Sequence, residues 1–167
     1  MRRRDFLMSA TAIAGLGLFA SLGFGSRRSA AEAAFPVTKT EDEWRKQLTP
    51  DQFAVLRQEA TERPFTSDLL HNAKHGTYNC VGCDTAVYAS ETKFDSGTGW
   101  PSFWQEIGGG IGTTTDYKLV YPRTEVHCAT CGGHLGHVFD DGPPPTGKRH
   151  CINGIVLAFR ETAAAAG

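Results

Sequence analysis

The sequence has no excess of either charge and no compositional bias towards collagen, coiled coils or disorder. Its 167 residues include 17 Lys and Arg against 18 Asp and Glu, and 40% of them are apolar, which is typical of a globular protein. It has no internal repeat beyond two Cys-x-x-Cys units, and its five cysteines are an odd number. The length predicts one domain with a substantial core. The odd count excludes a framework made only of intramolecular disulfides.

Residues 1–34 are predicted to be an export signal rather than part of the domain. They combine a basic start, an apolar and glycine-containing stretch from Met8 to about Gly25, and a small-residue Ala-x-Ala pattern, as secretory signals do. The Arg3-Arg4 pair resembles the twin-arginine type of signal, which predicts a periplasmic or otherwise extracytoplasmic protein. An uncleaved membrane anchor is the alternative, but the apolar stretch is at the short end for a span.

Without this signal the chain is acidic. The signal accounts for five arginines and two acids, so 12 basic and 16 acidic residues remain, a charge of −4. Because an acidic domain is a poor candidate for binding phosphate backbones, we expect no nucleic-acid partner.

The mature chain changes in texture near residue 76. Residues 35–75 carry helix-start signals at Thr40 and Thr49 and predict a helical N-terminal part, with one helix over roughly 50–60. Residues 76–161 predict a β-rich core, and residues 162–167 a disordered tail. The short β-like runs of the core, separated by Gly, Pro and Asp clusters, are residues 77–79, 86–89, 119–121, 124–127, 137–139 and 152–159. The expected fold class is mainly β (α+β): two small antiparallel sheets or a barrel-like pair, with peripheral helices.

Four of the cysteines form two Cys-x-x-Cys units, an arrangement typical of a tetrahedral zinc site. They are Cys80 with Cys83 and Cys128 with Cys131, and 44 residues separate the two units. We favour one structural Zn²⁺ over a rubredoxin-like iron site, two disulfides or a thioredoxin-like redox pair, since no βαβ pattern surrounds either unit. Four protein ligands leave no open position for water, so the metal is expected to stabilise the fold rather than to react.

The fifth cysteine, Cys151, is the candidate for chemistry. If the surrounding residues form a strand, Arg149, Cys151 and Asn153 share one face. A neighbouring cation lowers the pKa of a thiol, and Asn153 offers a neutral donor close to the sulfur. The alternative is a buried and inert core cysteine. The apolar run after Cys151 favours that alternative, whereas the polar neighbours on its own face favour a reactive thiol.

Two further segments carry candidate site residues. His134 and His137 lie three residues apart, just after the second cysteine unit, and are candidates for acid–base chemistry, with Asp141 as a group that orients one of them. The alternative is that these histidines only hydrogen-bond the local loop. Trp100 and Phe103 follow a glycine-rich stretch and predict either a loop that presents an aromatic ring or ordinary core packing.

Taken together, three segments resemble the peptide-methionine (R)-S-oxide reductases, the B-type methionine sulfoxide reductases. The segments are 93–103 (KFDSGTGWPSF), 134–142 (HLGHVFDDG) and 149–153 (RHCIN). The resemblance extends over about residues 40–160 and includes the order and spacing of the segments. It implies a β-rich fold of two antiparallel sheets and reduction of the R epimer of methionine sulfoxide, mainly in proteins. We expect such an enzyme to act as a monomer.

The resemblance also implies a role for each candidate residue. Cys151 attacks the sulfoxide sulfur and becomes a sulfenic acid, and one of two histidines protonates the oxygen. The implied catalytic residues besides Cys151 are His134, His137, Arg149, Asn153 and Asp141. The implied substrate-binding residues are Trp100, which packs on the ε-methyl group, and Phe103. The implied zinc ligands are Cys80, Cys83, Cys128 and Cys131.

Two departures from the family's pattern affect the expected cycle. Thr98 stands where many members have a resolving cysteine, and the four cysteines other than Cys151 are assigned to metal. We therefore expect no internal disulfide, and regeneration by an external thiol of thioredoxin-like or glutathione type. His150 stands where Tyr or Phe is usual, and by strand parity it points away from Cys151.

Two other functions stay open at this point. One is a zinc-ribbon module that binds a partner protein or nucleic acid, and the other is a thiol-disulfide oxidoreductase that uses a Cys-x-x-Cys pair. One tightly held zinc per chain argues against the oxidoreductase. A Cys151→Ser variant that loses sulfoxide reduction but keeps its zinc and fold argues against the binding module.

Overall fold

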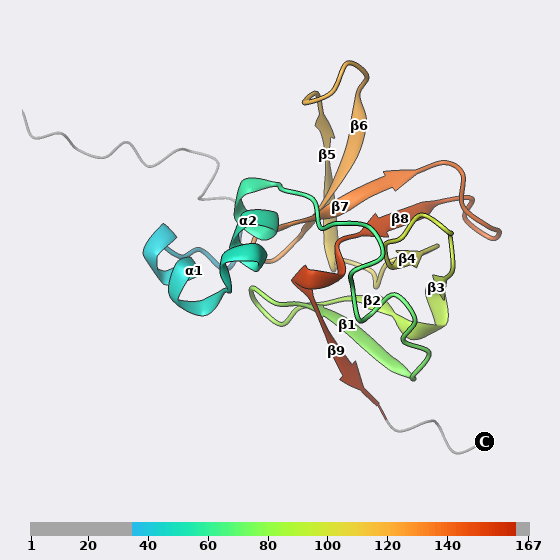
Figure 1. Cartoon of the computed structure of the whole chain (residues 1–167), viewed down its shortest axis with the longest axis horizontal. Coiled ribbons are helices and arrows are strands. Elements are labelled where there is room, and N and C mark those ends of the chain that lie inside the picture. The colour runs from blue at the N-terminus through green and yellow to red at the C-terminus, as the bar shows by residue number, and fades with distance from the viewer. Residues whose placement is uncertain (1–34, 163–167) are drawn as a thin grey trace, which may run out of the picture.

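The computed structural model describes residues 35–162 as two antiparallel sheets with two α-helices beside them (Figure 1). The predicted export signal and residues 163–167 of the predicted tail lie outside the described residues. The expected fold class, mainly β with peripheral helices, is confirmed. No helix within residues 35–162 is both long enough and apolar enough to cross a membrane.

The two helices begin where the capping signals predicted. α1 spans Glu41–Gln47 and α2 spans Pro50–Gln58. The side chains of Thr40 and Thr49 each accept from the backbone N–H of the third helical residue, which satisfies a donor that the first turn leaves without a partner. The buried side chains of the helices join the core; they are Trp44, Phe53, Val55 and Leu56.

The smaller sheet has three strands in the order β2-β1-β9. β1 spans Gly76–Cys80, β2 spans Ala86–Ala89 and β9 spans Leu157–Glu161. β1 pairs antiparallel with both neighbours, so the last strand of the chain lies against the first (Figure 1).

The larger sheet has six strands in the order β3-β4-β8-β7-β6-β5, and all neighbouring pairs are antiparallel. The strands are β3 Lys93–Phe94, β4 Ser102–Phe103, β5 Ile111–Asp116, β6 Arg123–Cys128, β7 His134–Phe139 and β8 Arg149–Ile152. Two single-turn 3-10 helices interrupt the strands, η2 (Ser90–Thr92) before β3 and η3 (Gly154–Val156) between β8 and β9. β7 and β8 therefore occupy the middle of the larger sheet and carry the candidate histidines and Cys151.

The two sheets share an aromatic core. Tyr78 of β1, Tyr88 of β2 and Phe103 of β4 are fully buried. The Phe103 ring stacks on Tyr88 with centroids 4.3 Å apart and meets the edge of Tyr78 at 5.0 Å. This packing corrects the expectation that Phe103 binds substrate, because its ring is committed to the contact between the sheets.

Two predicted strands differ from the observed ones. Residues 119–121 lie in the turn that joins β5 to β6, and their apolar side chains are exposed, since the strands on both sides of them pair with each other. The predicted run 152–159 is broken by η3, where the chain passes from the larger sheet to the smaller one. β5 was not predicted, because its sequence IGTTTD lacks an apolar alternation.

Candidate active site

Cys151 lies in a small cavity on the larger sheet, with a volume of about 120 Å³. The cysteine belongs to the central strand β8, and its side chain is partly buried. His137 of β7 and Arg123 at the start of β6 line the cavity from the neighbouring strands, and Thr61 and Trp100 line it from two loops. The remaining lining residues are Gly136, Phe139 and Asn153.

The pairing register places the thiol and one imidazole on the same face of the sheet. Cys151 pairs directly with His137 on one side and with Ser102 on the other. Directly opposed residues of an antiparallel pair project to the same side, with Cβ atoms about 4.5–5.5 Å apart. Gly136 permits the close approach of β7, because a Cβ there would lie 2.1 Å from the carbonyl oxygen of Cys151. The structure thus brings together the cysteine and one of the two predicted histidines.

A bulge in β7 turns both candidate histidines to this face. Residues three apart in a regular strand point to opposite faces. The register with β6 shifts after His134, so Leu135 is an extra residue and the alternation reverses. The rings of His134 and His137 lie 5.4 Å apart. His134 is only 3% exposed and is not among the described residues that line the cavity, so His137 is the histidine in position for proton transfer.

Two carboxylates that the sequence did not single out hold these rings. Asp116 Oδ2 lies 2.8 Å from Nε2 of His137, and Glu125 Oε1 lies 2.7 Å from Nδ1 of His134. The bond from His134 lowers the pKa of Glu125 to about 2, while burial lowers the pKa of the His137 imidazole. A carboxylate accepts, so the proton of neutral His137 lies on Nε2 and leaves Nδ1 without one.

Asp141 pairs with Arg149 rather than with a histidine, which corrects its expected role. The Nε and Nη2 atoms of Arg149 donate to the two carboxylate oxygens of Asp141 at 2.8 and 2.9 Å. The guanidinium also lies 4.4 Å from the centre of the Phe139 ring, a favourable cation–π contact. Asp141 and Phe139 together fix Arg149 on the side of β8 that carries Cys151.

Burial raises the pKa of the Cys151 thiol above its ordinary value. Thr98, whose Oγ1 lies 3.7 Å from the sulfur, and the charge of Arg149 both act in the opposite direction. The prediction that the cation lowers the thiol pKa is therefore wrong in its net result. Removing the thiolate from water costs more than the nearby charge returns.

Asn153 lines the cavity but is not the free donor that the sequence predicted. Its amide nitrogen donates to the carbonyl of Leu135 at 2.9 Å, and its amide oxygen accepts from the backbone N–H of Glu62 at 2.8 Å. The indole N–H of Trp100 donates to the carbonyl oxygen of the same Glu62 at 2.9 Å. Trp100 thus has the cavity-lining place that was predicted for it, and Asn153 links three segments of the cavity wall.

His150 points away from Cys151, as strand parity predicted. It is 5% exposed, and its Nδ1 lies 3.1 Å from the hydroxyl oxygen of Tyr88. Burial lowers the pKa of this imidazole, which is consistent with a neutral ring that packs in the core between the sheets.

The other four cysteines form a separate cluster that could hold a metal ion. The Sγ atoms of Cys80, Cys83, Cys128 and Cys131 all lie within 4.8 Å of one another. Two of the distances between sulfurs are 3.7 and 3.5 Å. Zn–S bonds of about 2.3 Å in a tetrahedron place sulfurs about 3.8 Å apart, so the donor set fits a tetrahedral thiolate metal.

The cluster joins the two sheets and is covered by the helices. One pair of cysteines belongs to the β1–β2 turn of the smaller sheet and the other to the β6–β7 turn of the larger one. Gln47 of α1 donates to the carbonyl of Gly82 at 2.9 Å, and Arg57 of α2 donates to the carbonyl of Cys131 at 3.0 Å. A metal held here would connect both sheets and both helices.

Fold and site together define a class: a small two-sheet β protein in which one thiol faces an imidazole and four thiols are gathered at a metal-type cluster. The SelR domain family matches residues 48–161, most of the described chain. The chain belongs to this family.

The relatives have one kind of name in common. The chain is 55% identical over 119 residues to "Peptide methionine sulfoxide reductase B1, chloroplastic" of Arabidopsis thaliana, an alignment that covers 71% of this chain and 59% of the relative. It is 51% identical over 125 residues to "Peptide methionine sulfoxide reductase MsrB" of Methanosarcina barkeri, covering 74% and 88%. The protein of that name from Agrobacterium fabrum is 50% identical over 124 residues, covering 74% and 92%. The chain spans about 60% of the length of the chloroplastic relatives.

Proposed function

We propose that this protein reduces methionine (R)-sulfoxide in proteins and peptides to methionine. The observation that carries the proposal is the cavity in which Cys151 lies opposite His137 and beside Trp100. Membership of the SelR family and the names of relatives that are 50–55% identical support it.

The first step moves one proton and one oxygen atom. Both reacting groups begin neutral, because burial raises the pKa of the Cys151 thiol and lowers that of His137. The imidazole takes the thiol proton at Nδ1, the thiolate attacks the sulfoxide sulfur, and the imidazole returns the proton to the sulfoxide oxygen. Trp100 packs on the methyl group of the substrate. Transfer of the oxygen to the cysteine sulfur releases methionine and leaves Cys151 as a sulfenic acid.

The sulfenic acid is reduced by a thiol from outside the chain. An external thiol attacks the Cys151 sulfur and displaces the oxygen as water, and a second thiol then releases the mixed disulfide. Thr98, not a cysteine, is the side chain within 3.7 Å of this sulfur, and the other four cysteines lie in the metal cluster. A thioredoxin-like or glutathione-type donor is the partner, and the enzyme acts as a monomer.

The four-cysteine cluster holds one structural Zn²⁺. Four thiolates fill a tetrahedral site, so the metal supplies folding energy and no reacting group. Metal analysis of the purified chain should find one zinc per molecule, and iron in its place would overturn this assignment.

Residues 1–34 are an export signal of the twin-arginine type, and the enzyme repairs proteins outside the cytoplasm. The basic start, the apolar stretch and the Ala-x-Ala pattern support this part of the proposal. Cell fractionation tests it: the mature chain is expected outside the cytoplasm, and replacing Arg3 and Arg4 with lysine should retain it inside. Mature protein found only in the cytoplasm contradicts export.

The activity is tested with purified R and S epimers of N-acetyl-methionine sulfoxide and a dithiol donor. The wild-type chain should reduce the R epimer only, and Cys151→Ser should abolish turnover while zinc content and circular dichroism stay unchanged. A wild-type chain that reduces neither epimer refutes the proposed activity. Full turnover in the serine variant refutes the role of Cys151.

A further inference from the structure

Glu62 lies in the segment between α2 and β1, which has no regular secondary structure, yet it makes three hydrogen bonds to the segments around Cys151. Its backbone N–H donates to the side chain of Asn153 at 2.8 Å, and its carbonyl accepts from the indole of Trp100 at 2.9 Å. Its carboxylate accepts from the backbone N–H of Gly154 at 2.7 Å. One loop residue therefore contacts the segments before β4 and after β8.

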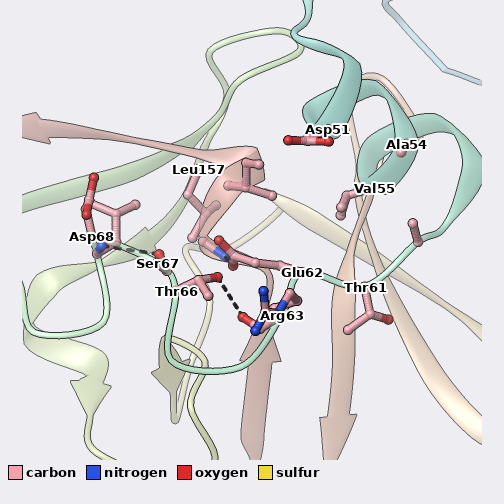
Figure 2. A pocket seen from close by; sticks show the side chains of 14 residues that line it. Asp51, Ala54, Val55, Thr61, Glu62, Arg63, Thr66, Ser67, Asp68 and Leu157 are labelled. Carbon is pink, nitrogen blue, oxygen red and sulfur yellow. Dashed lines mark hydrogen bonds between the residues drawn. The ribbon is translucent and has the colours of Figure 1, made fainter.

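Two of these partners form the wall of the reaction cavity, whereas Glu62 itself does not line it. Trp100 and Asn153 line the cavity with Cys151. Glu62 instead lines a second cavity of about 680 Å³ between α2 and η3, where Figure 2 shows it next to Thr61. Any effect of Glu62 on the reaction must therefore pass through the residues that it holds.

The carboxylate is what fixes the backbone of Glu62 in this position. Asn153 and Gly154 are consecutive, so the backbone N–H and the side chain of Glu62 grip neighbouring residues at the end of β8. The neighbouring residues Thr61 and Arg63 are exposed and offer no comparable anchor. Without the bond to Gly154, the carbonyl that orients the Trp100 indole is held only by the amide of Asn153.

We propose that Glu62 is a positioning residue for sulfoxide reduction: its carboxylate clamps the loop to Gly154, and its backbone thereby sets the indole of Trp100 and the amide of Asn153 at the cavity wall. This inference rests on the proposed function. The role depends on reach and on an acceptor oxygen, not on charge. Glutamine keeps an acceptor at the same reach, while aspartate keeps the charge but is one methylene shorter.

The test compares Glu62→Ala, Glu62→Asp and Glu62→Gln with wild type on N-acetyl-methionine (R)-sulfoxide. The alanine and aspartate variants should lose between about tenfold and a hundredfold in kcat/KM, mainly through KM, because misplacement of about 1 Å has effects of this size. The glutamine variant should stay close to wild type. Alkylation of Cys151 by iodoacetamide should be unchanged in all three, since the thiol itself does not contact Glu62.

Asp68→Asn and Asp68→Ala are the matched controls, because Asp68 is an exposed acid in the same loop and lines the same second cavity. Both should retain wild-type kinetics. An alanine variant with a lowered melting temperature but unchanged kcat/KM overturns the proposal, as does rescue by aspartate and not by glutamine. If the wild-type chain itself fails to reduce the R epimer, the proposed function fails instead, and the two failures are distinguishable.

Discussion

Replacing Thr98 with cysteine tests whether the cycle needs an external thiol because no second sulfur lies near Cys151. Thr98 Oγ1 lies 3.7 Å from the Cys151 sulfur, whereas the sulfurs of a disulfide lie about 2.0 Å apart with Cβ atoms about 3.8 Å apart. The remaining gap of about 1.7 Å is within reach of side-chain rotation and a small loop shift. Gly97 and Gly99, which flank Thr98, both have positive φ values of 70° and 90°, so this turn already relies on glycine freedom.

The assay exposes each protein to the (R)-sulfoxide without reductant and then to dimedone, followed by mass spectrometry. The wild-type chain and a Thr98→Ser control should stop at a sulfenic acid that dimedone traps on Cys151. Thr98→Cys should instead form a disulfide between positions 98 and 151 and give no dimedone adduct. A dimedone adduct in Thr98→Cys equal to that of wild type would refute the close approach of residue 98 to the reactive sulfur.

Three further predictions concern the core, the thiol and the metal. Phe103→Ala should lower the free energy of unfolding by about 3–5 kcal/mol, as loss of a buried phenyl ring does, without raising KM below the melting temperature; a raised KM at unchanged stability would return Phe103 to the substrate site. Because burial raises the pKa of Cys151, its alkylation rate should still rise above pH 9.0, and Arg149→Ala should shift the midpoint further upward; a midpoint below that pH contradicts the burial argument. Cys128→Ser or a strong chelator should remove the metal and unfold the chain in circular dichroism, since binding energy at such a site is folding energy; an unchanged melting temperature would show that the cluster does not stabilise the fold.

Local patterns were sufficient to predict the helix starts and the cysteine cluster. The capping boxes at Thr40 and Thr49 are complete within four residues, so their interpretation does not depend on tertiary structure. Each Cys-x-x-Cys unit is a single turn, and two matching units need only be brought together by the fold. Alternation along residues 149–152 likewise predicted that His150 faces away from Cys151.

The parts that could not be predicted depend on strand pairing. Asp116 and Glu125 reach the histidines only because β5, β6 and β7 pair in one register, and nothing in the local sequence marks either acid. The extra residue Leu135 in β7 reverses the alternation and brings His134 to the same face as His137.

Burial decided the two chemical corrections. The polar neighbours of Cys151 suggested a lowered thiol pKa, but the depth of the sulfur in the sheet outweighs them. Phe103 lies two residues after the glycine-rich loop closes, where β4 already pairs with β8. Its ring is therefore turned into the core between the sheets.

The most direct test of the division between one reactive and four metal-binding sulfurs is to map the oxidised chain after a single turnover. The zinc-containing enzyme is mixed with the R epimer and dimedone without reductant, and the adduct and the zinc are then counted on the same sample. One adduct on Cys151 with one zinc retained per chain is the predicted result. An adduct or a disulfide at Cys80, Cys83, Cys128 or Cys131, or zinc released in step with turnover, would contradict it.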